Sequence, residues 1–169
     1  KGLVGLVYWE NGFRNLTNSK RAINKVEDLE GIKLRVMQNN VYLNSFKTLG
    51  ANAVPMAFSE LFSALETNTV DGQENPFNTI LSSKFYEVQK YVTVTNHVYA
   101  PWIVLVSKKW WDQLSKDEQK ILSDAAKLSR DFERKDTRDE AAKAVADLKA
   151  KGMQINQLPP AAAARMRDK

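Results

Sequence analysis

The chain has 169 residues, of which 43% are hydrophobic, which is enough for one globular domain or two small lobes. Lysine and arginine number 25 against 20 acidic residues, giving a net charge of +5, and the two signs are too mixed to indicate a nucleic-acid partner. The absence of cysteine excludes disulfides, thiol nucleophiles and thiolate metal sites.

The two ends of the chain read as interrupted elements. Residues 1–9, "KGLVGLVYW", are typical of a strand already under way, with no start signal before Lys1. At the other end, Pro159 and Pro160 predict the start of a helix, and the chain stops soon afterwards. We therefore expect the chain to be a fragment of a longer protein, with a cut at Lys1.

Residues 33–40, "KLRVMQNN", place a charged side chain inside an apolar segment. Residues 34–37 are predicted to form a buried strand that carries Arg35. Because a guanidinium keeps its charge and is costly to bury alone, an anion should lie opposite Arg35. That anion is either a carboxylate of this protein or one that arrives from outside, and the same two alternatives apply to Arg14.

The middle of the chain alternates between helices and extended segments. Residues 41–49 predict a helix that stops at Gly50, and Ser59 is a candidate N-cap for the next one. The remaining expected elements are an extended segment at 53–58, one helix over 77–91, and strands at 92–98, 102–106 and 153–158.

A long helix is expected between these last strands. "SKDE", residues 115–118, is a capping box that opens a helical pattern ending near Gly152. Residues 133–140 of this helix are almost wholly charged, so we expect little protein to pack on them, as when a helix crosses between two lobes.

This alternation predicts an α/β architecture with a mainly parallel sheet. Ligands of such sheets bind outside the carboxyl ends of the strands. Residues 35–38 and 73–75 lie at strand-to-helix junctions and are the expected ligand positions.

Residues suited to catalysis are few. The chain has one histidine, His97, which we expect to be structural, and no nucleophile elbow, phosphate loop or zinc-binding motif. Glu74 is the only plausible acid or base near the junctions, and it has no obvious partner. An enzyme of organic-acid metabolism, with Arg35 as carboxylate anchor and Glu74 as base, stays open as an alternative. No metal or cofactor is expected.

The candidate site is one of polar recognition. An arginine presents a planar fork that matches a carboxylate with two hydrogen bonds. The candidates are Arg14, Arg35, Gln38 and Asn75, with Phe58, Trp9 and Trp102 as apolar walls.

Three runs of sequence resemble a known family. "RVMQN" (35–39), "VPMAFSEL" (54–61) and "TVDGQENP" (69–76) are similar to the solute-binding proteins of TRAP (tripartite ATP-independent periplasmic) transporters, in the branch that binds four-carbon dicarboxylates. The resemblance extends over essentially the whole chain. It implies a two-lobed α/β clamshell that binds an organic acid, such as a dicarboxylate, in the periplasm and passes it to a membrane permease.

The resemblance also implies roles for single residues. Arg35 matches the arginine that forms the salt bridge to the ligand carboxylate, and Asn75 matches a residue that hydrogen-bonds the ligand. Arg14 and Phe58 match residues that line the same cleft. Gln38 matches a position where the family varies its polar contact with the ligand. His97 matches a position behind the residues that touch the ligand, and Trp9 and Trp102 are candidates for the same supporting role.

Against this family the chain lacks a preceding stretch that builds most of the first lobe. We expect residues 1–9 to be a strand of the hinge or first lobe, 10–100 to be the second, ligand-binding lobe, and 101–169 to return to the first lobe through a strand, the long helix and a last strand. Without its cover, the isolated chain should self-associate or pair with the missing lobe. The side chains expected to be uncovered are Leu3, Val4, Val7, Ile103, Leu105 and Ile121.

Overall fold

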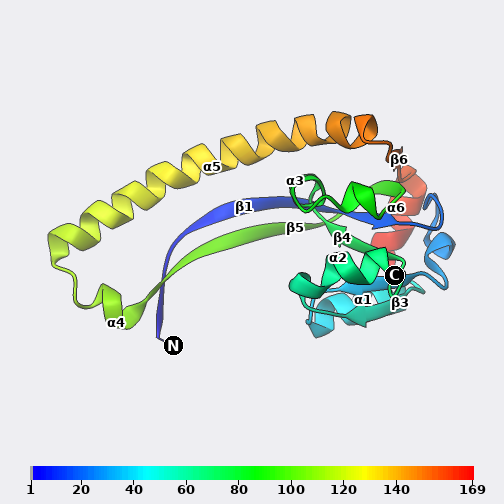
Figure 1. Ribbon diagram of the computed structural model, residues 1–169. Helices are drawn as coiled ribbons and strands as arrows, with labels where there is room; N and C mark the ends of the chain where they lie inside the picture. The colour runs from blue at the N-terminus through cyan, green and yellow to red at the C-terminus, as the bar shows by residue number, and fades with distance from the viewer. Residues whose placement is uncertain (1) are drawn as a thin grey trace.

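The computed structural model describes residues 2–169, so the expectation about Lys1 lies outside the described residues. A six-stranded sheet in the order β3-β2-β4-β1-β5-β6 forms the centre of a globular lobe. Two strands, β1 (Leu3–Asn18) and β5 (Tyr91–Ser107), continue far beyond this lobe as a long curved ribbon. Helix α5 (Lys116–Ala150) arches alongside the ribbon and returns to the lobe (Figure 1).

The sheet is mixed, which corrects the expectation of a mainly parallel one. Strand β2 (Lys33–Val36) is parallel to its neighbours β3 (Asn52–Pro55) and β4 (Gly72–Asn75). Strand β1, however, is antiparallel to both β4 and β5, and its pairing with β5 is the longest in the molecule. The sequence pattern shows strands and helices in alternation but not which strands pair, so it could not reveal this.

The strands expected at 92–98 and 102–106 are one continuous strand, β5. Pro101 lies within it, opposite Glu10 of β1. Proline has no N–H to give to a second neighbour, and it is tolerated where a strand forms an edge. Since β6 (Gln154–Gln157) pairs with β5 only over Tyr91–Val94, Pro101 stands on such an edge.

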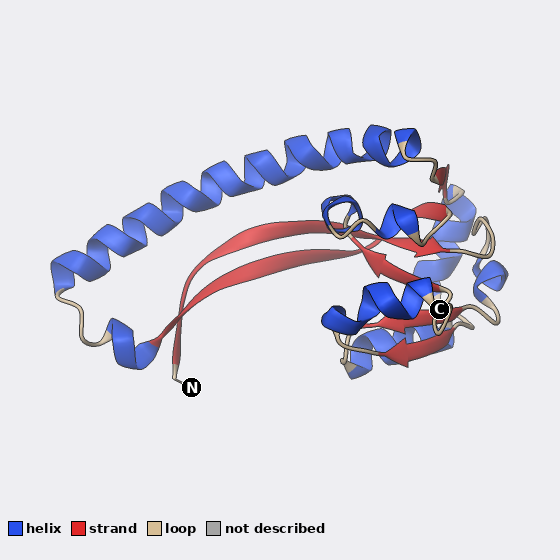
Figure 2. Ribbon diagram, in the orientation of Figure 1, coloured by secondary structure: helices blue, strands red, loops and turns tan. Residues whose placement is uncertain are grey.

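Short helices cover the sheet on both faces, as Figure 2 shows. The helix expected after Gln38 is α1. Helix α2 begins two residues earlier than a Ser59 N-cap allows, because Ala57 occupies the N-cap position. The helices are α1 (Asn40–Thr48), α2 (Phe58–Glu66), α3 (Phe77–Ser82), α4 (Lys108–Trp111), α5 and α6 (Pro160–Asp168), with 3-10 turns η1 (Val26–Leu29) and η2 (Phe85–Glu87).

The single helix expected over 77–91 is wrong. Helix α3 ends at Ser82, and Lys84 adopts a left-handed conformation with φ of 55°. The short turn η2 follows, and β5 has begun by Tyr91. The apolar spacing was nevertheless meaningful, because Ile80 and Phe85 are both buried in one core.

Each face of the sheet has its own core. One core contains Leu34 and Phe46 and is covered by α1 and α6. The other contains Leu61 and Ile80 and reaches Leu148 at the end of α5. Leu158 belongs to the first core and β6 pairs in the same sheet, so the last strand and helix pack on this lobe. The last strand was expected in the other lobe.

The capping box of α5 is confirmed, since Ser115 and Glu118 exchange hydrogen bonds at its start. The expectation that residues 133–140 pack against little protein is wrong. Arg134 donates two hydrogen bonds to the carbonyl of Tyr8, and Arg138 forms an ion pair with the buried carboxylate of Glu10. The charges of this stretch therefore fasten the helix to the ribbon.

Across residues 2–169, none of the helices is both long enough and apolar enough to cross a membrane.

Candidate ligand-binding site

Arg35 is buried on β2 without a carboxylate partner among residues 2–169. Its side chain comes from the strand that ends at Val36, and the residue is only 2% exposed. Nε and Nη2 both donate to the backbone carbonyl of Met56, at 2.9 and 2.8 Å. Since a guanidinium has five N–H donors, the edge formed by Nη1 and Nη2 keeps donors for another acceptor.

The surroundings of Arg35 disfavour its charge on balance. Burial lowers the pKa of the Arg35 guanidinium, the Glu74 carboxylate raises it, and the Arg14 guanidinium lowers it. The ring of Phe58, which begins α2 and is half exposed, lies 5.9 Å from the centre of the guanidinium. A buried cation in this setting would gain from an additional anion on its remaining edge.

Asn75 ends β4 and is also buried. Because Leu34 pairs with Gly72 and side chains alternate along each strand, Arg35 and Asn75 project from the same face of the sheet. The side-chain nitrogen of Asn75 donates to Oε1 of Gln73 at 2.6 Å. The two residues thus place an arginine fork and an amide at the carboxyl ends of neighbouring parallel strands, where a ligand was expected.

Arg14 belongs to a different arrangement on the opposite face. Its Nη2 donates to Oε1 of Glu74 at 2.9 Å, and its Nε pairs with Oε2 of the same carboxylate. Nε2 of His97 lies 3.1 Å from Oε2 of Glu74, and Nδ1 of His97 lies 2.7 Å from the Thr95 hydroxyl. Arg14 therefore has the internal partner that the sequence left open, whereas Arg35 does not.

The interpretation of Glu74 as a residue without a partner is wrong. Burial raises the pKa of the Glu74 carboxyl, but the hydrogen bonds from His97 and Arg14 lower it and prevail, so that its pKa lies below the ordinary value. Glu74 is fully buried and both of its oxygens are engaged. These partners lie 60 and 23 residues away along the chain, beyond any local motif.

The other expected site residues lie farther from Arg35 or are less enclosed. Gln38 is exposed in the turn between β2 and α1. Trp9 and Trp102 face each other across the ribbon, and Trp9 is five residues from Arg14, about 16 Å along a strand. They stay predictions as ligand neighbours, and they are not grouped with Arg35 and Asn75.

One contact of each arginine was not foreseen. The Met56 carbonyl orients the guanidinium, and Tyr42 of α1 lies with its ring 5.7 Å from the guanidinium carbon of Arg14. A hollow of about 560 Å³ lies beside Tyr42 and is also lined by Phe46 and His97. The one signal in the sequence is "VPMAF", in which Met56 directly follows the extended segment.

Comparison with known proteins gives one consistent result. A family model described as bacterial extracellular solute-binding protein, family 7, matches residues 1–169. The 2,3-diketo-L-gulonate-binding periplasmic protein of Escherichia coli is 39% identical over 155 residues, covering 92% of this chain and 47% of that protein.

Solved structures agree closely in fold. The sugar acid binding protein of Advenella mimigardefordensis, in complex with galactonate, is 55% identical with a TM-score of 0.96, covering 99% of this chain and 54% of that one. A TRAP periplasmic solute binding protein from Polaromonas, bound to D-erythronate, is 44% identical with a TM-score of 0.93, covering 98% and 55%. The chain therefore spans about half the length of the relatives that it matches.

These matches confirm the α/β class and the TRAP resemblance inferred from the sequence. They are solute-binding proteins of transport systems and not enzymes, which removes the support for Glu74 as a catalytic base. From "RVMQN" to the arrangement of β2, β4 and the long ribbon, sequence and fold agree: the chain belongs to the bacterial extracellular solute-binding protein family 7.

Proposed function

We propose that this protein is the periplasmic solute-binding component of a TRAP transporter, which binds an organic acid through Arg35 and delivers it to a membrane permease. The names of the relatives support the periplasm and an acid ligand, since they include a periplasmic binding protein for a diketo sugar acid and proteins bound to galactonate and D-erythronate.

The arrangement of Arg35 is the observation that carries this proposal. The guanidinium is buried, its Nε–Nη2 edge is fixed by the Met56 carbonyl, and its remaining edge faces no carboxylate of residues 2–169. A ligand carboxylate on that edge would form charge-assisted hydrogen bonds in a setting where the charge is otherwise disfavoured. Burial of the Arg35 charge is unfavourable in the empty protein, and a bound carboxylate would relieve this, which favours binding.

The ligand proposed first is a sugar acid, ahead of a four-carbon dicarboxylate. Asn75 is neutral and suits a hydroxyl or one carboxylate oxygen, and Arg14 is already paired with Glu74. Within the described lobe, the site therefore offers one charged fork and one amide, which match one carboxylate with hydroxyl groups beside it.

The test is calorimetric titration of the full-length protein with galactonate, D-erythronate and succinate. Losing one partner of a buried charged pair costs about 2 to 5 kcal/mol, so Arg35→Ala should weaken binding by roughly 30-fold to several thousand-fold. Arg35→Lys should recover little, because an ammonium cannot present two parallel donors. Arg130→Ala, on the outer part of α5, serves as the control and should bind normally.

Thermal melting of the same variants without added acid separates ligand binding from folding. We expect Arg35→Ala to melt close to the unmodified protein, since it loses no ion pair. If Arg35→Ala lowers the melting temperature but leaves affinity intact, Arg35 is a structural residue and the proposal fails. Saturable binding without chemical change of the acid is also required.

A further inference from the structure

Behind Asn75, three buried polar side chains continue along the sheet away from the proposed ligand. They are Gln73 of β4, Thr17 of β1 and Gln89 of the loop before β5. We propose that these residues form a directional hydrogen-bond relay that fixes the orientation of the Asn75 amide for ligand recognition. This inference rests on the proposed role of Asn75 as a ligand contact.

The relay consists of three consecutive side-chain hydrogen bonds. Nδ2 of Asn75 donates to Oε1 of Gln73 at 2.6 Å, and Nε2 of Gln73 donates to the Thr17 hydroxyl at 2.9 Å. The Thr17 hydroxyl donates to Oε1 of Gln89 at 2.8 Å. Gln73 and Thr17 are fully buried, and Asn75 and Gln89 are each 5% exposed, so water competes little with these bonds.

The direction of every bond follows from the far end of the relay. Nε2 of Gln89 lies against two backbone carbonyls, those of Asp71 and Val88, at 3.3 and 3.0 Å. A carbonyl can only accept, so the nitrogen of this amide must face them and its oxygen must face Thr17. The Thr17 hydroxyl has one proton and gives it to Gln89, which leaves its oxygen to accept.

The same logic carries to the ligand end. Because Thr17 accepts, Gln73 must turn its nitrogen toward Thr17 and its oxygen toward Asn75. Asn75 then has to direct its nitrogen at Gln73. Reversing the Asn75 amide would set two oxygens against each other in a buried site, which is costly.

The relay therefore decides what Asn75 offers to a ligand. One N–H is committed to Gln73, and Oδ1 accepts no hydrogen bond from residues 2–169. A ligand that satisfies both remaining groups supplies a donor to Oδ1 and an acceptor to the second N–H. A hydroxyl beside a carboxylate provides this combination, whereas two carboxylate oxygens at Asn75 would leave Oδ1 facing an anion.

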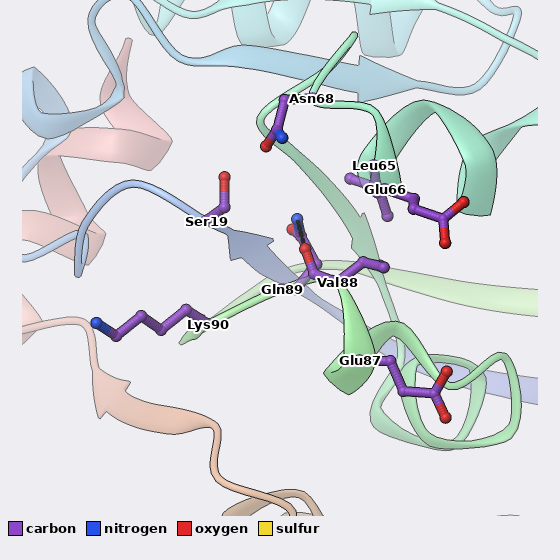
Figure 3. A pocket seen from close by; sticks show the side chains of 8 residues that line it. All are labelled: Ser19, Leu65, Glu66, Asn68, Glu87, Val88, Gln89 and Lys90. Atoms are coloured by element: carbon purple, nitrogen blue, oxygen red, sulfur yellow. Dashed lines mark hydrogen bonds between the residues drawn. The ribbon is translucent and has the colours of Figure 1, made fainter.

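The relay is anchored at a solvent-accessible hollow on the other end of the lobe. Gln89 lines this hollow of about 420 Å³ together with Ser19, Leu65 and Lys90 (Figure 3). From Asn75 back to Asp71, the residue before β4, an extended chain spans about 13 Å, at roughly 3.3 Å per residue. Gln89 is buried at the wall of this hollow, and methionine is close to it in length and size, so Gln89→Met should not overfill the core.

The experiment measures galactonate affinity in the full-length protein for two matched variants at one position. Thr17→Val has nearly the same shape but no hydroxyl, and Thr17→Ser keeps the hydroxyl. We expect Thr17→Val to weaken binding by about 3- to 10-fold and Thr17→Ser to recover most of this loss. Gln89→Met, which removes the anchor at the hollow, should weaken binding similarly and add nothing to Thr17→Val.

A double-mutant cycle with Asn75→Ala separates positioning from packing. If Thr17 acts through Asn75, then Thr17→Val has no further effect once Asn75 is alanine. A full additional loss in that background, or a lower melting temperature with unchanged affinity, would overturn the relay. If Asn75→Ala alone binds galactonate normally, there is nothing to position, and the inference fails while the Arg35 proposal stands.

A ligand-independent measurement covers the case in which none of the acids binds. Nitrogen-edited NMR of the side-chain amides should show one Asn75 amide proton that exchanges slowly with water. Thr17→Val should accelerate that exchange and Thr17→Ser should not. Equal exchange rates in the unmodified protein, Thr17→Val and Thr17→Ser would overturn the relay, whether or not any of the acids binds.

Discussion

Two buried arginines on adjacent parts of one sheet are accommodated in opposite ways. Arg14 faces a carboxylate of its own chain, Glu74, which is in turn held by His97. Arg35 has only a backbone carbonyl and the face of an aromatic ring. The sequence predicted that Arg35 would be buried and left the partner of each arginine open, because Glu74 is remote from Arg14 along the chain.

The pairing of Glu74 makes stability depend on pH. Burial alone would raise the pKa of its carboxyl, but the hydrogen bonds from His97 and Arg14 hold the folded-state pKa below the ordinary value for a glutamate carboxyl. The folded state thus binds fewer protons, so this contribution is complete above roughly pH 5 and is lost as the pH falls through the folded-state pKa.

We therefore expect Glu74→Gln to melt at a lower temperature than the unmodified protein at pH 7 and to lose less on acidification. Thermal melts at several pH values between 7 and 3 measure this difference. Glu66→Gln, which changes an exposed glutamate on α2, is the control and should follow the unmodified protein. Parallel curves for Glu74→Gln and the unmodified protein would contradict the assignment.

At the scale of elements, the sequence predicted best what is decided within a few residues. The capping box at Ser115 was readable because Glu118 lies one turn away. The helix expected over 77–91 failed because the same apolar spacing is met by a short helix, a left-handed Lys84 and a 3-10 turn packed on one core. The pairing of β1 with β4 and β5 depends on contacts between distant residues, which no local pattern contains.

That pairing depends on a glycine where β1 and β4 meet. A Cβ on Gly72 would lie 2.3 Å from the backbone carbonyl of Thr17, and a backbone atom cannot move aside as a side chain can. We expect Gly72→Ala to lower the free energy of unfolding by about 1 to 3 kcal/mol or more. Gly5→Ala, on the partner strand β1, meets only side-chain atoms of Ile103 and Leu105, the nearest at 3.2 Å, and should change stability by less than about 1 kcal/mol.

Chemical denaturation of both glycine variants measures the difference. The unfolding midpoint should fall for Gly72→Ala and barely move for Gly5→Ala, with similar slopes for the two transitions. Equal midpoints would show that the strands can separate enough to accept a methyl group, and that the contact of β1 with β4 is looser than the structure indicates.

At the scale of the whole molecule, the lobe is well enclosed but the ribbon and the outer part of α5 are not. Val7 is buried, contrary to the expectation that it would be uncovered. Other apolar side chains on these elements are substantially exposed, and Leu128 and Phe132 reach 74% and 72%. The exposed set on the ribbon and α5 includes Leu3, Tyr8, Trp102, Ile103, Leu105, Ile121, Leu128 and Phe132.

Exposed apolar surface of this extent favours association. We expect the 169-residue chain to form oligomers at micromolar concentration and to bind a dye that reports apolar surface. A protein of the length of its relatives has further residues that can cover the same side chains, and should scatter light as a smaller species and bind less dye.

The paired change Leu128→Lys and Phe132→Lys should shift the 169-residue chain toward the monomer, because charge on α5 opposes burial there. Light scattering at several concentrations measures this shift, with Lys135→Ala on the same helix as the control. A dilute monomer that binds no dye would show that the ribbon and α5 are stable in water as they stand.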